Sequence, residues 1–427
     1  MLKIKKFIKD INNKKSKIAI IGLGYIGLPL ALTTALNGYQ TIGLDINQKK
    51  IKALLKGKSY IKDIPNNKLI KVINNNTFIP TNNYELLKKI NIIIICLPTP
   101  LTKRKKPNLT AIYNALKKIK KYAKKNSLII IESTTYPTFT EKVNKNHLKD
   151  NYYLAFSPER IDPTNKQFNL ENTPRVIGGI NQESTLLAKS FYNNIIKAQL
   201  LTVSNPTTAE MSKLLENTYR LVNIALISEF TKTCQLLKIN IWEVIEAAKS
   251  KPYGFQPFYP NVGVGGHCIP IDPIYLNWLM KKKKLNLPLI NLSIKITKKM
   301  PYLILKIIKQ ILKKEKIKKA KILIIGITYK KDTTDLRESP TLKLIELLIK
   351  RKINVSFYDP YIKEIKIKKK KIKRTNLNAL SNFNLVILCV DHSLLDYDFI
   401  YSNSSLILDL KNTKTKTKLK GGIIYDL

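Results

Sequence analysis

Short, uninterrupted apolar runs recur through the first half of the chain, and each run ends at glycine, proline or polar residues. Runs of about four to six apolar residues between turn signals are typical of strands that are buried on both faces of a parallel sheet. The strands predicted in this way are 17–21, 41–44, 91–96, 128–131, 175–179 and 198–203. Helix-like segments such as 28–36 lie between them, which indicates a doubly wound α/β domain.

The apolar period changes at residue 207 to that of a helix, which continues to about residue 237, and a second helical segment covers about 294–311. Strand-like runs then return at 320–326, 353–359, 385–389 and 406–409. The fold class that follows is α/β, with two Rossmann-like doubly wound domains joined by a central helical segment. The expected boundaries are 1–203, 204–303 and 304–427.

Composition places the chain among globular proteins, because 427 residues with 44% hydrophobic residues are sufficient for two or three domains with cores. No run of about 18 apolar residues predicts a membrane span, and residues 1–10 lack the apolar core of a signal peptide. The four cysteines (Cys96, Cys234, Cys268 and Cys389) lie far apart without a CxxC pair, which argues against a zinc site or a disulfide framework. We therefore expect a cytoplasmic protein with neither a membrane partner nor a bound metal.

The net charge of +47, from 76 Lys and Arg against 29 Asp and Glu, would attract polyanions. The lysines are spread from end to end among many isoleucines and asparagines, and all three residues have AT-rich codons, so a biased genome explains the excess. No aromatic-interleaved basic motif of a nucleic-acid module is present. We expect no specific nucleic-acid partner, and selected nucleic-acid binding is the alternative.

The first predicted strand is followed by Gly22-Leu23-Gly24-Tyr25-Ile26-Gly27, and the second ends on Asp45. A lone GxGxxG motif is weak evidence for a dinucleotide site, but here strand, turn, helix, strand and terminal acid follow in the order that such a site requires. The glycines allow a tight turn and close approach of a pyrophosphate, so the whole turn, including Tyr25 and Ile26, is expected to border a dinucleotide. Asp45 would bind the adenosine ribose hydroxyls and repel a 2′-phosphate, which favours NAD as the cofactor over NADP. The alternative is a βαβ unit with a glycine turn and no dinucleotide.

Polar, proline-bearing loops follow two of these predicted strands, and a third such loop follows the apolar residues 154–156. They contain Pro98 and Thr99 after 91–96, Thr134 after 128–131, and Glu159 and Arg160 after the apolar residues 154–156. In open α/β sheets, ligands bind beyond the carboxyl ends of the strands. We therefore expect these loops to border the cofactor.

The stretch 259–273 places Cys268 at the end of a glycine-rich turn and Asp272 four residues later. A cysteine presented in this way can be an accessible nucleophile if a nearby group stabilises its thiolate. The alternative is a small buried apolar residue behind a loop.

Lys213 and Asn217 are i and i+4 in the helix predicted from residue 207, so both project from one face. Facing a pocket, they could supply a positive charge and a neutral donor to a developing oxyanion. Alternatively, they are solvated residues on a helix surface.

Six motifs occur in the order that they have in one enzyme family. They are GLGYIGLPLA (22–31), ESTTYP (132–137), SPERIDP (157–163), AEMSKLLENTYR (209–220), GGHCIPIDP (265–273) and GITYKKDTTDLRESP (326–340). From about residue 17 to its C-terminus the chain resembles the UDP-glucose/GDP-mannose dehydrogenase family. KPYGFQPFYP (251–260) most resembles the UDP-N-acetylglucosamine or galactosamine 6-dehydrogenase branch.

The resemblance implies an NAD-dependent, four-electron oxidation of the C6 alcohol of a UDP-N-acetylhexosamine, for surface-polysaccharide biosynthesis. UDP-N-acetylglucosamine is the expected substrate, and UDP-glucose, UDP-N-acetylmannosamine and UDP-N-acetylgalactosamine are the alternatives. Cys268 would capture the sugar aldehyde as a thiohemiacetal, which a second hydride transfer converts to a thioester. Lys213 and Asn217 would stabilise the oxyanion, and Asp272 would orient water or Lys213.

By the same resemblance, Glu159 would be the general base for thioester hydrolysis, and Thr134 would help to hold the water. Arg337 would reach the NAD pyrophosphate of the same or a neighbouring subunit, in a homodimer or higher homo-oligomer. The implied substrate-binding residues are Glu159, Arg160, Lys213, Asn217, Tyr259, Gly263, Gly265 and Lys330. The resemblance implies that the predicted segments 1–203, 204–303 and 304–427 are, in this order, an NAD-binding domain, a central helical and dimerisation segment, and a C-terminal UDP-sugar-binding domain.

Two other functions stay open. A two-electron hydroxyacid dehydrogenase of the 6-phosphogluconate type would share the first domain but would need no cysteine. A catalytically impaired basic scaffold would fit the charge and an altered loop, because residues 260–263 read Pro-Asn-Val-Gly where the branch usually has Pro-Gly-Pro-Gly. This change is expected to reshape the substrate loop.

Overall fold

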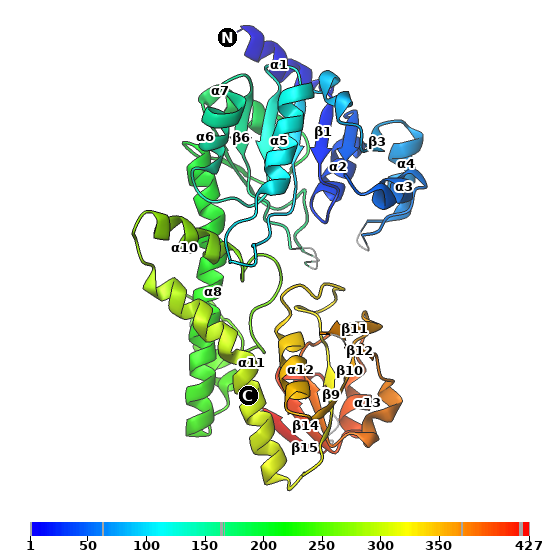
Figure 1. The fold of residues 1–427 in the computed structure, drawn as a ribbon, viewed down its shortest axis with the longest axis vertical. Helices are drawn as coiled ribbons and strands as arrows, with labels where there is room; N and C mark the ends of the chain where they lie inside the picture. The colour runs from blue at the N-terminus through cyan, green and yellow to red at the C-terminus, as the bar shows by residue number, and fades with distance from the viewer. Residues whose placement is uncertain are drawn as a thin grey trace. The chain divides into compact units, whose positions relative to one another are not determined.

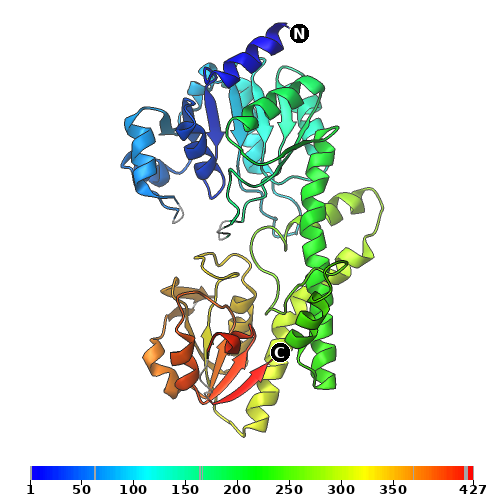
Figure 2. The ribbon, with the colours of Figure 1, turned by 180° about the vertical axis from the view of Figure 1, so that it is seen from behind.

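The computed structural model describes residues 2–61, 64–162, 165, 167–368, 370–417 and 422–426. It divides into two compact units (Figures 1 and 2). The first comprises Met1–Glu216 and Ile274–Leu279, and the second comprises Asn217–Pro273 and Met280–Leu427. Each unit contains a largely parallel sheet with helices on both faces, which confirms the predicted doubly wound α/β class.

The sheet of the first unit has the strand order β3-β2-β1-β4-β5-β6-β7-β8, and every pairing except β6 with β7 is parallel. Its strands are β1 (Ile18–Ile21), β2 (Thr41–Leu44), β3 (Phe78–Thr81), β4 (Ile92–Ile95), β5 (Leu128–Ile131), β6 (Tyr153–Phe156), β7 (Arg175–Gly179) and β8 (Leu200–Thr202). β1, β4 and β5 are buried along their whole length, which their runs of isoleucine and leucine favour because both faces are covered.

Nine helices of the described residues belong to the first unit ahead of its last strand. They are α1 (Leu2–Asn12), α2 (Gly27–Leu36), α3 (Gln48–Leu55), α4 (Asn66–Asn74), η1 (Tyr84–Lys89), α5 (Thr110–Tyr122), α6 (Phe139–Val143), η2 (Asn144–Leu148) and α7 (Gln182–Asn193). Side chains of α1, α2, α4 and α7 share one core with one face of the sheet. α5 lies over the other face (Figure 1).

The central part of the chain is helical, with α8 (Pro206–Leu237), α9 (Ile241–Lys249), α10 (Asp272–Lys282) and α11 (Pro288–Lys314). α8 begins in the first unit and ends in the second. α10 begins two residues before the segment that belongs to the first unit.

The sheet of the second unit is parallel throughout, in the order β10-β9-β13-β14-β15, and a separate antiparallel hairpin pairs β11 with β12. The strands are β9 (Lys321–Ile325), β10 (Asn354–Tyr358), β11 (Glu364–Ile367), β12 (Lys370–Lys373), β13 (Leu385–Leu388), β14 (Leu406–Asp409) and β15 (Ile423–Asp426). The remaining helices are α12 (Pro340–Lys350), η3 (Leu377–Asn382), α13 (Tyr397–Ser402) and η4 (Thr413–Lys416). α11 and α12 pack on one face of this sheet, and η3 and α13 pack on the other.

The strand registers bring the loops that follow the strands to one edge of each sheet. In the first unit Ile21 pairs with Leu44 and Ile95, and Ile95 pairs in turn with Ile131. The loops after β1, β2, β4 and β5 therefore begin side by side. The same holds in the second unit, where Ile325 is in register with Tyr358 and with Leu388.

Candidate active site

The first glycine turn exposes bare backbone at one of its three glycines. Gly22 follows β1 with a φ of +98°, and a Cβ there would lie 2.5 Å from the Cys96 carbonyl oxygen. A Cβ on Gly27 would lie 1.9 Å from the Gly22 carbonyl oxygen, so packing within the protein requires glycine at both positions. A Cβ on Gly24 would meet no atom within 4 Å. Gly24 is therefore where a phosphate can approach the backbone at the start of α2.

Asp45 lies at the same edge, directly after β2, with a buried carboxylate. Its Oδ2 accepts a hydrogen bond from the Leu23 backbone N–H (3.0 Å), and its Oδ1 accepts one from the Asn47 N–H (2.9 Å). Lys50, on α3, places its Nζ 3.1 Å from Oδ2. A carboxylate at the end of the second strand is what an adenosine ribose with a free 2′-hydroxyl requires, so this edge fits NAD.

The other residues expected at the cofactor lie on the loops of this edge. Tyr25 is 51% exposed, whereas Ile26 is the N-cap residue of α2 and packs against the core. Pro98 is exposed after β4, and Thr99 is buried with its carbonyl accepting a hydrogen bond (2.7 Å) from a tyrosine hydroxyl of α10. Thr134 is half-buried after β5. Their contacts with a cofactor stay predictions.

Glu159 and Lys213 form a buried pair in the first unit. They are 7% and 5% exposed. The Lys213 Nζ donates a hydrogen bond to the Glu159 carbonyl oxygen (2.7 Å) and lies 3.9 Å from the carboxylate Oε2. Burial raises the pKa of the Glu159 carboxyl, while the Lys213 charge and a hydrogen bond from the Ile161 N–H oppose that shift. A carboxyl with a raised pKa next to an ammonium group is suited to proton transfer at neutral pH.

Arg160, the neighbour of Glu159, is engaged by other groups. Its Nη2 lies 2.6 Å from Glu216 Oε1, and its Nη1 donates a hydrogen bond to the Pro174 carbonyl oxygen (3.1 Å). The substrate contact expected of Arg160 remains a prediction. Pro163, the last residue of the SPERIDP motif, lies outside the described residues.

In the second unit, Cys268 is partly exposed, whereas the other three cysteines are buried. The alternative of a fully buried thiol therefore describes Cys96, Cys234 and Cys389 but not Cys268. Its carbonyl accepts hydrogen bonds from the backbone N–H groups of residues 271 (3.0 Å) and 272 (2.9 Å), so a tight turn joins it to α10. The cysteine is thus presented from a fixed turn.

The glycines before Cys268 pack against the loop 326–340. Gly266 has a φ of +85° and donates its N–H to the Arg337 carbonyl oxygen (3.0 Å). Cβ atoms on Gly265 and Gly266 would lie 2.6 and 2.8 Å from Tyr329 side-chain atoms. Any side chain at these positions would push the two loops apart, which explains the glycine pair.

Asn217 and Asp272 are hydrogen-bonded to each other, with 2.6 Å between Nδ2 and Oδ2. Asp272 is 2% exposed and is the first residue of α10, where a carboxylate is stabilised by the helix dipole. α8 is continuous, so Lys213 and Asn217 lie one turn apart on one face of it. Both are buried, so the alternative that they are solvated surface residues is wrong.

The segment before the glycine turn is anchored by aromatic and apolar contacts. Tyr259 stacks on Trp242, with ring centroids 5.7 Å apart, and its hydroxyl donates to Glu246 (2.9 Å). Val262, where the branch usually has proline, is fully buried in the core of the second unit. The altered residue therefore fixes this loop by burial.

Three further residues expected at the substrate or cofactor lie in or against the loop 326–340. Gly263 packs against Pro340, because a Cβ there would lie 3.0 Å from the proline Cβ. Lys330 is half-buried. The hydrogen bonds of Asp335 raise the pKa of Arg337, against the effect of burial, and the Cys268 thiolate adds to the rise. Arg337 therefore lies within electrostatic reach of Cys268.

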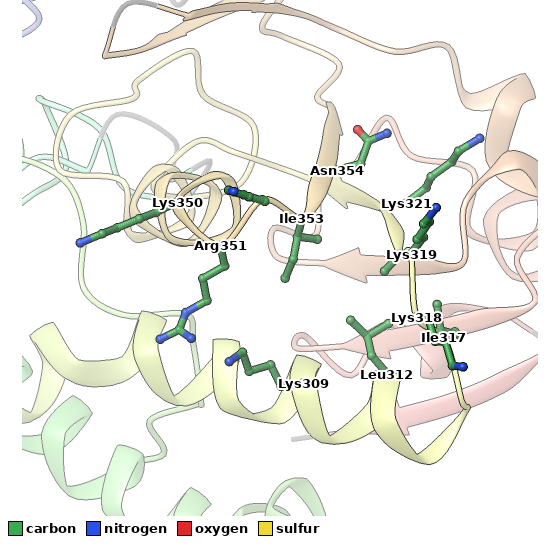
Figure 3. Close-up of a pocket in the computed structure, with 12 residues that line it drawn as sticks. Lys309, Leu312, Ile317, Lys318, Lys319, Lys321, Lys350, Arg351, Ile353 and Asn354 are labelled. Carbon is green, nitrogen blue, oxygen red and sulfur yellow. The ribbon is translucent and has the colours of Figure 1, made fainter.

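A cavity of about 760 Å³ lies in the second unit, away from these loops (Figure 3). It opens where β9 and β10 begin, whereas the loops discussed above follow the ends of strands. Seven of its lining residues are lysine or arginine, and none of the predicted site residues lines it. In a chain this rich in lysine, such a lining needs no ligand to explain it.

Within the described part of the chain, no group of three or more His, Cys, Asp or Glu side chains could hold a metal ion. None of the described helices is both long enough and apolar enough to cross a bilayer.

Sequence models of three domains match the chain. They are the NAD binding domain (16–196), the central domain (207–299) and the UDP binding domain (323–416) of the UDP-glucose/GDP-mannose dehydrogenase family. The chain belongs to the UDP-glucose/GDP-mannose dehydrogenase family. It is an NAD-dependent nucleotide-sugar dehydrogenase, and its substrate is a UDP-sugar.

Relatives of this chain carry different substrate names. The UDP-N-acetyl-D-mannosamine dehydrogenase of Methanococcus aeolicus is 37% identical over 422 residues, which cover 95% of this chain and 92% of that protein. The UDP-N-acetyl-D-glucosamine 6-dehydrogenase of Pseudomonas aeruginosa is 33% identical, with 82% and 84% covered. A solved UDP-D-ManNAc dehydrogenase of Pyrococcus horikoshii has a TM-score of 0.86 at 32% identity, covering 96% of this chain and 98% of that one.

Two residues of this dehydrogenase join the candidate site although sequence reasoning did not single them out. Lys50 pairs with Asp45, and no motif marks it among so many lysines. Glu210, on α8, is 1% exposed and accepts hydrogen bonds at Oε1 from the Thr135 hydroxyl and from the Thr140 N–H and hydroxyl. Burial raises its pKa to about 7. Glu210 ties α8, three residues before Lys213, to the loop that carries Thr134.

Proposed function

We propose that this chain oxidises the C6 hydroxymethyl group of a UDP-N-acetylhexosamine to a carboxylate in two NAD-dependent steps. The observation that carries the proposal is the pair of buried contacts on α8, Lys213 with Glu159 and, one turn later, Asn217 with Asp272. Two buried donors on one helical turn, each held by a carboxyl-bearing residue, are suited to stabilising an oxyanion and moving a proton.

The sugar that we propose is N-acetylmannosamine, in place of the N-acetylglucosamine expected from the sequence. Support comes from relatives: proteins named UDP-N-acetyl-D-mannosamine dehydrogenase are 35–38% identical over 81–97% of this chain. The relative named for UDP-N-acetyl-D-glucosamine is 33% identical. UDP-N-acetylglucosamine is the second candidate.

The residues proposed to hold NAD are those of the first sheet edge, with Gly24 at the phosphates and Asp45 and Lys50 at the ribose. Bound NAD⁺ supplies the hydride acceptor for each oxidation. Open space over Gly24 and the ribose-type carboxylate of Asp45 support this assignment. Arg337 remains a proposed pyrophosphate ligand of the same or a neighbouring subunit.

Cys268 is the proposed nucleophile. The first oxidation removes a hydride from C6 and a proton from its hydroxyl, which leaves an aldehyde. The Cys268 thiol then adds to the aldehyde: its sulfur forms a bond to C6, and its S–H proton passes to the oxygen, which gives a thiohemiacetal. Loss of a second hydride and of that proton gives a thioester, whose carbonyl oxygen Lys213 and Asn217 would stabilise as it gains charge.

Glu159 is the proposed general base for the last step, with Thr134 helping to hold the water. It takes a proton from water, the water oxygen bonds to C6, and the C–S bond breaks to return the Cys268 thiol and release the carboxylate. Because burial raises the pKa of Glu159, its basic form is lost at a higher pH than for an exposed glutamate. Activity limited by this step should therefore fall already in mildly acidic solution.

A homodimer is the proposed assembly, formed through α8. Large apolar side chains stand exposed along this helix at Leu215, Leu226, Phe230 and Leu237. At about 100° per residue their spacing keeps all four within an arc of about 60°, which is a continuous apolar stripe. The proposed setting is the cytoplasm, in the synthesis of a surface polysaccharide.

The test is the NADH released per UDP-sugar consumed, with UDP-N-acetylmannosamine, UDP-N-acetylglucosamine and UDP-glucose compared. Two equivalents with the mannosamine sugar, at a higher kcat/KM than with the others, support the proposal. One equivalent favours a two-electron enzyme, and no NADH with any UDP-sugar overturns the proposal. The Cys268→Ser variant should lose the double oxidation, while Cys234→Ser, which changes a buried thiol, should retain the stoichiometry of two.

A further inference from the structure

The second unit repeats the strand-turn-acid arrangement of the NAD-type edge. Gly326 follows β9 with a φ of +82°, as Gly22 follows β1 with +98°. Asp359 follows β10, and its Oδ2 accepts a hydrogen bond from the Ile327 N–H (2.8 Å) while its Oδ1 accepts one from the Tyr361 N–H (2.9 Å). Asp45 makes the matching pair of contacts, with the N–H of Leu23 directly after Gly22 and with the N–H of Asn47, two residues after the acid.

The two acids differ in their third partner. Asp45 has a lysine Nζ beside it, whereas the Oδ2 of Asp359 lies 3.0 Å from Nε2 of His392. Asp359 and His392 are both 0% exposed. The His392 imidazole therefore occupies the position beside Asp359, and this second glycine turn has no carboxylate available to bind a ribose.

The hydrogen bonds of His392 fix its proton. Nδ1 faces the Asp332 backbone N–H at 3.0 Å, and an N–H can only donate, so Nδ1 must accept. Nε2 then carries the hydrogen, and both of its neighbours can accept it: the Asp359 carboxylate and the Thr328 hydroxyl oxygen (3.3 Å). Both ring nitrogens of His392 are thus in use.

These contacts fall on both sides of Lys330. Two residues before it, the Thr328 hydroxyl accepts from His392 and donates its own hydrogen to the Lys330 carbonyl oxygen (2.8 Å). Two residues after it, the Asp332 N–H is held by Nδ1. Asp332 has a φ of +58°, and Ser393, next to the histidine, donates to its carboxylate through both the N–H (2.8 Å) and the hydroxyl (2.6 Å).

We propose that His392 is a positioning residue that holds Lys330 in place for the UDP-sugar. The inference rests on the proposed function, because it uses Lys330 as a substrate contact. In this proposal, the glycine turn after β9 serves as a rigid support for the loop that carries Lys330. Because Tyr329 of the same loop packs on the glycines before Cys268, the support also extends to the cysteine turn.

Two variants separate the two nitrogens of His392. Asparagine places an oxygen near the position of Nδ1, so H392N keeps an acceptor for the Asp332 N–H and loses the donor to Asp359. Glutamine reaches the position of Nε2, so H392Q keeps that donor and loses the acceptor. We expect H392Q to raise KM for the UDP-sugar about ten-fold, as for a buried donor left without its acceptor. Its kcat and its KM for NAD should change less than about two-fold. H392N, which loses the longer contact of Nε2 with Thr328 (3.3 Å) but keeps the acceptor for Asp332, should raise KM for the UDP-sugar less than H392Q does.

A double-variant cycle tests whether the effect passes through Lys330. Lys330→Met removes the proposed substrate contact, so adding H392Q to it should leave KM for the UDP-sugar unchanged within about two-fold. A full additional ten-fold rise in that background would overturn the proposal, as would a wild-type KM in H392Q or equal losses in H392N and H392Q.

Hydrogen exchange of the segment 328–335 gives a readout that needs no activity. H392Q should speed exchange in this segment, and H392N should speed it less, because it keeps the acceptor for the Asp332 N–H. If the wild type oxidises no UDP-sugar, the proposed function fails, and this measurement still decides whether His392 holds the loop. Unchanged exchange in H392Q would refute that holding role in either case.

Discussion

Replacing Glu210 by glutamine should remove a pH dependence of folding stability. Burial raises the pKa of this carboxyl from 4.5 to about 7, and the hydrogen bonds of Thr140 and Thr135 only partly oppose the rise. The folded state therefore binds more protons than the unfolded state between about pH 4.5 and pH 7, so stability falls as the pH rises through this window. A shift of about 2.5 units at about 1.36 kcal/mol per unit gives about 3 kcal/mol.

The Glu210→Gln side chain is neutral at every pH and keeps a carbonyl oxygen for the three threonine donors. The stability of the variant relative to the wild type should thus increase by about 3 kcal/mol between pH 4.5 and pH 8 and should level off above pH 7. Urea unfolding is the assay, because an uncharged denaturant leaves electrostatics unscreened. Trp278 packs on Tyr136 in the first unit, so a Trp242→Phe background makes tryptophan fluorescence report on that unit.

A stability difference that stays constant from pH 5 to pH 8 would refute this reasoning, since the carboxyl would then ionise in the folded protein without cost. Glu141→Gln is the matched control for the substitution itself. Glu141 is exposed, and its Oε1 accepts a hydrogen bond from the Thr207 hydroxyl (3.0 Å) at the start of α8.

Three further predictions concern the cofactor turn, the base and the assembly. Gly24→Ala should raise KM for NAD about ten-fold at unchanged thermal stability. Gly27→Ala should lower stability by about 1–3 kcal/mol, because its Cβ would meet backbone 1.9 Å away. If the two variants change KM for NAD and stability to the same extent, the assignment of Gly24 to the phosphates is wrong. Glu159→Gln should slow steady-state turnover about 10²- to 10⁴-fold while a thioester accumulates, visible as a burst of NADH and as added mass on the intact protein. Phe230→Asp should shift the proposed dimer to monomer in analytical ultracentrifugation, and a dimer that persists would exclude the stripe on α8 as its interface.

Much of the fold could be predicted because buried parallel strands are short apolar runs. β2, β5 and β7 have the bounds predicted from the sequence. β3 was missed because Pro80 argues against a strand, yet β3 is at the edge of its sheet, where a missing N–H leaves no ladder bond unmade. α1 was missed because lysines interrupt its apolar residues, although Ile4 and Ile11 are seven apart and both buried. The domain boundaries at 203 and 303 stay predictions.

The candidate site could be predicted as far as strand ends determine it. Gly22 and Asp45 follow neighbouring strands in register, so sequence order alone brings them together. Partners that come from distant segments have no local signal. Arg160 with Glu216, and Tyr259 with Glu246, are paired by tertiary structure, and no spacing along the chain indicates either contact.

Lys213 shows where composition misleads and burial decides. In a chain with 76 Lys and Arg, the residue type carries almost no information about function. A codon bias adds lysine where an ammonium group stays in water, which costs little. Among the lysines that the structure describes, Lys213 has the smallest exposed fraction, 5%. Removing an ammonium group from water costs several kcal/mol, and the Glu159 carbonyl and carboxyl help to offset that cost. Drift in composition cannot explain a lysine held at such a cost, so its burial is the reason to expect a chemical role for it.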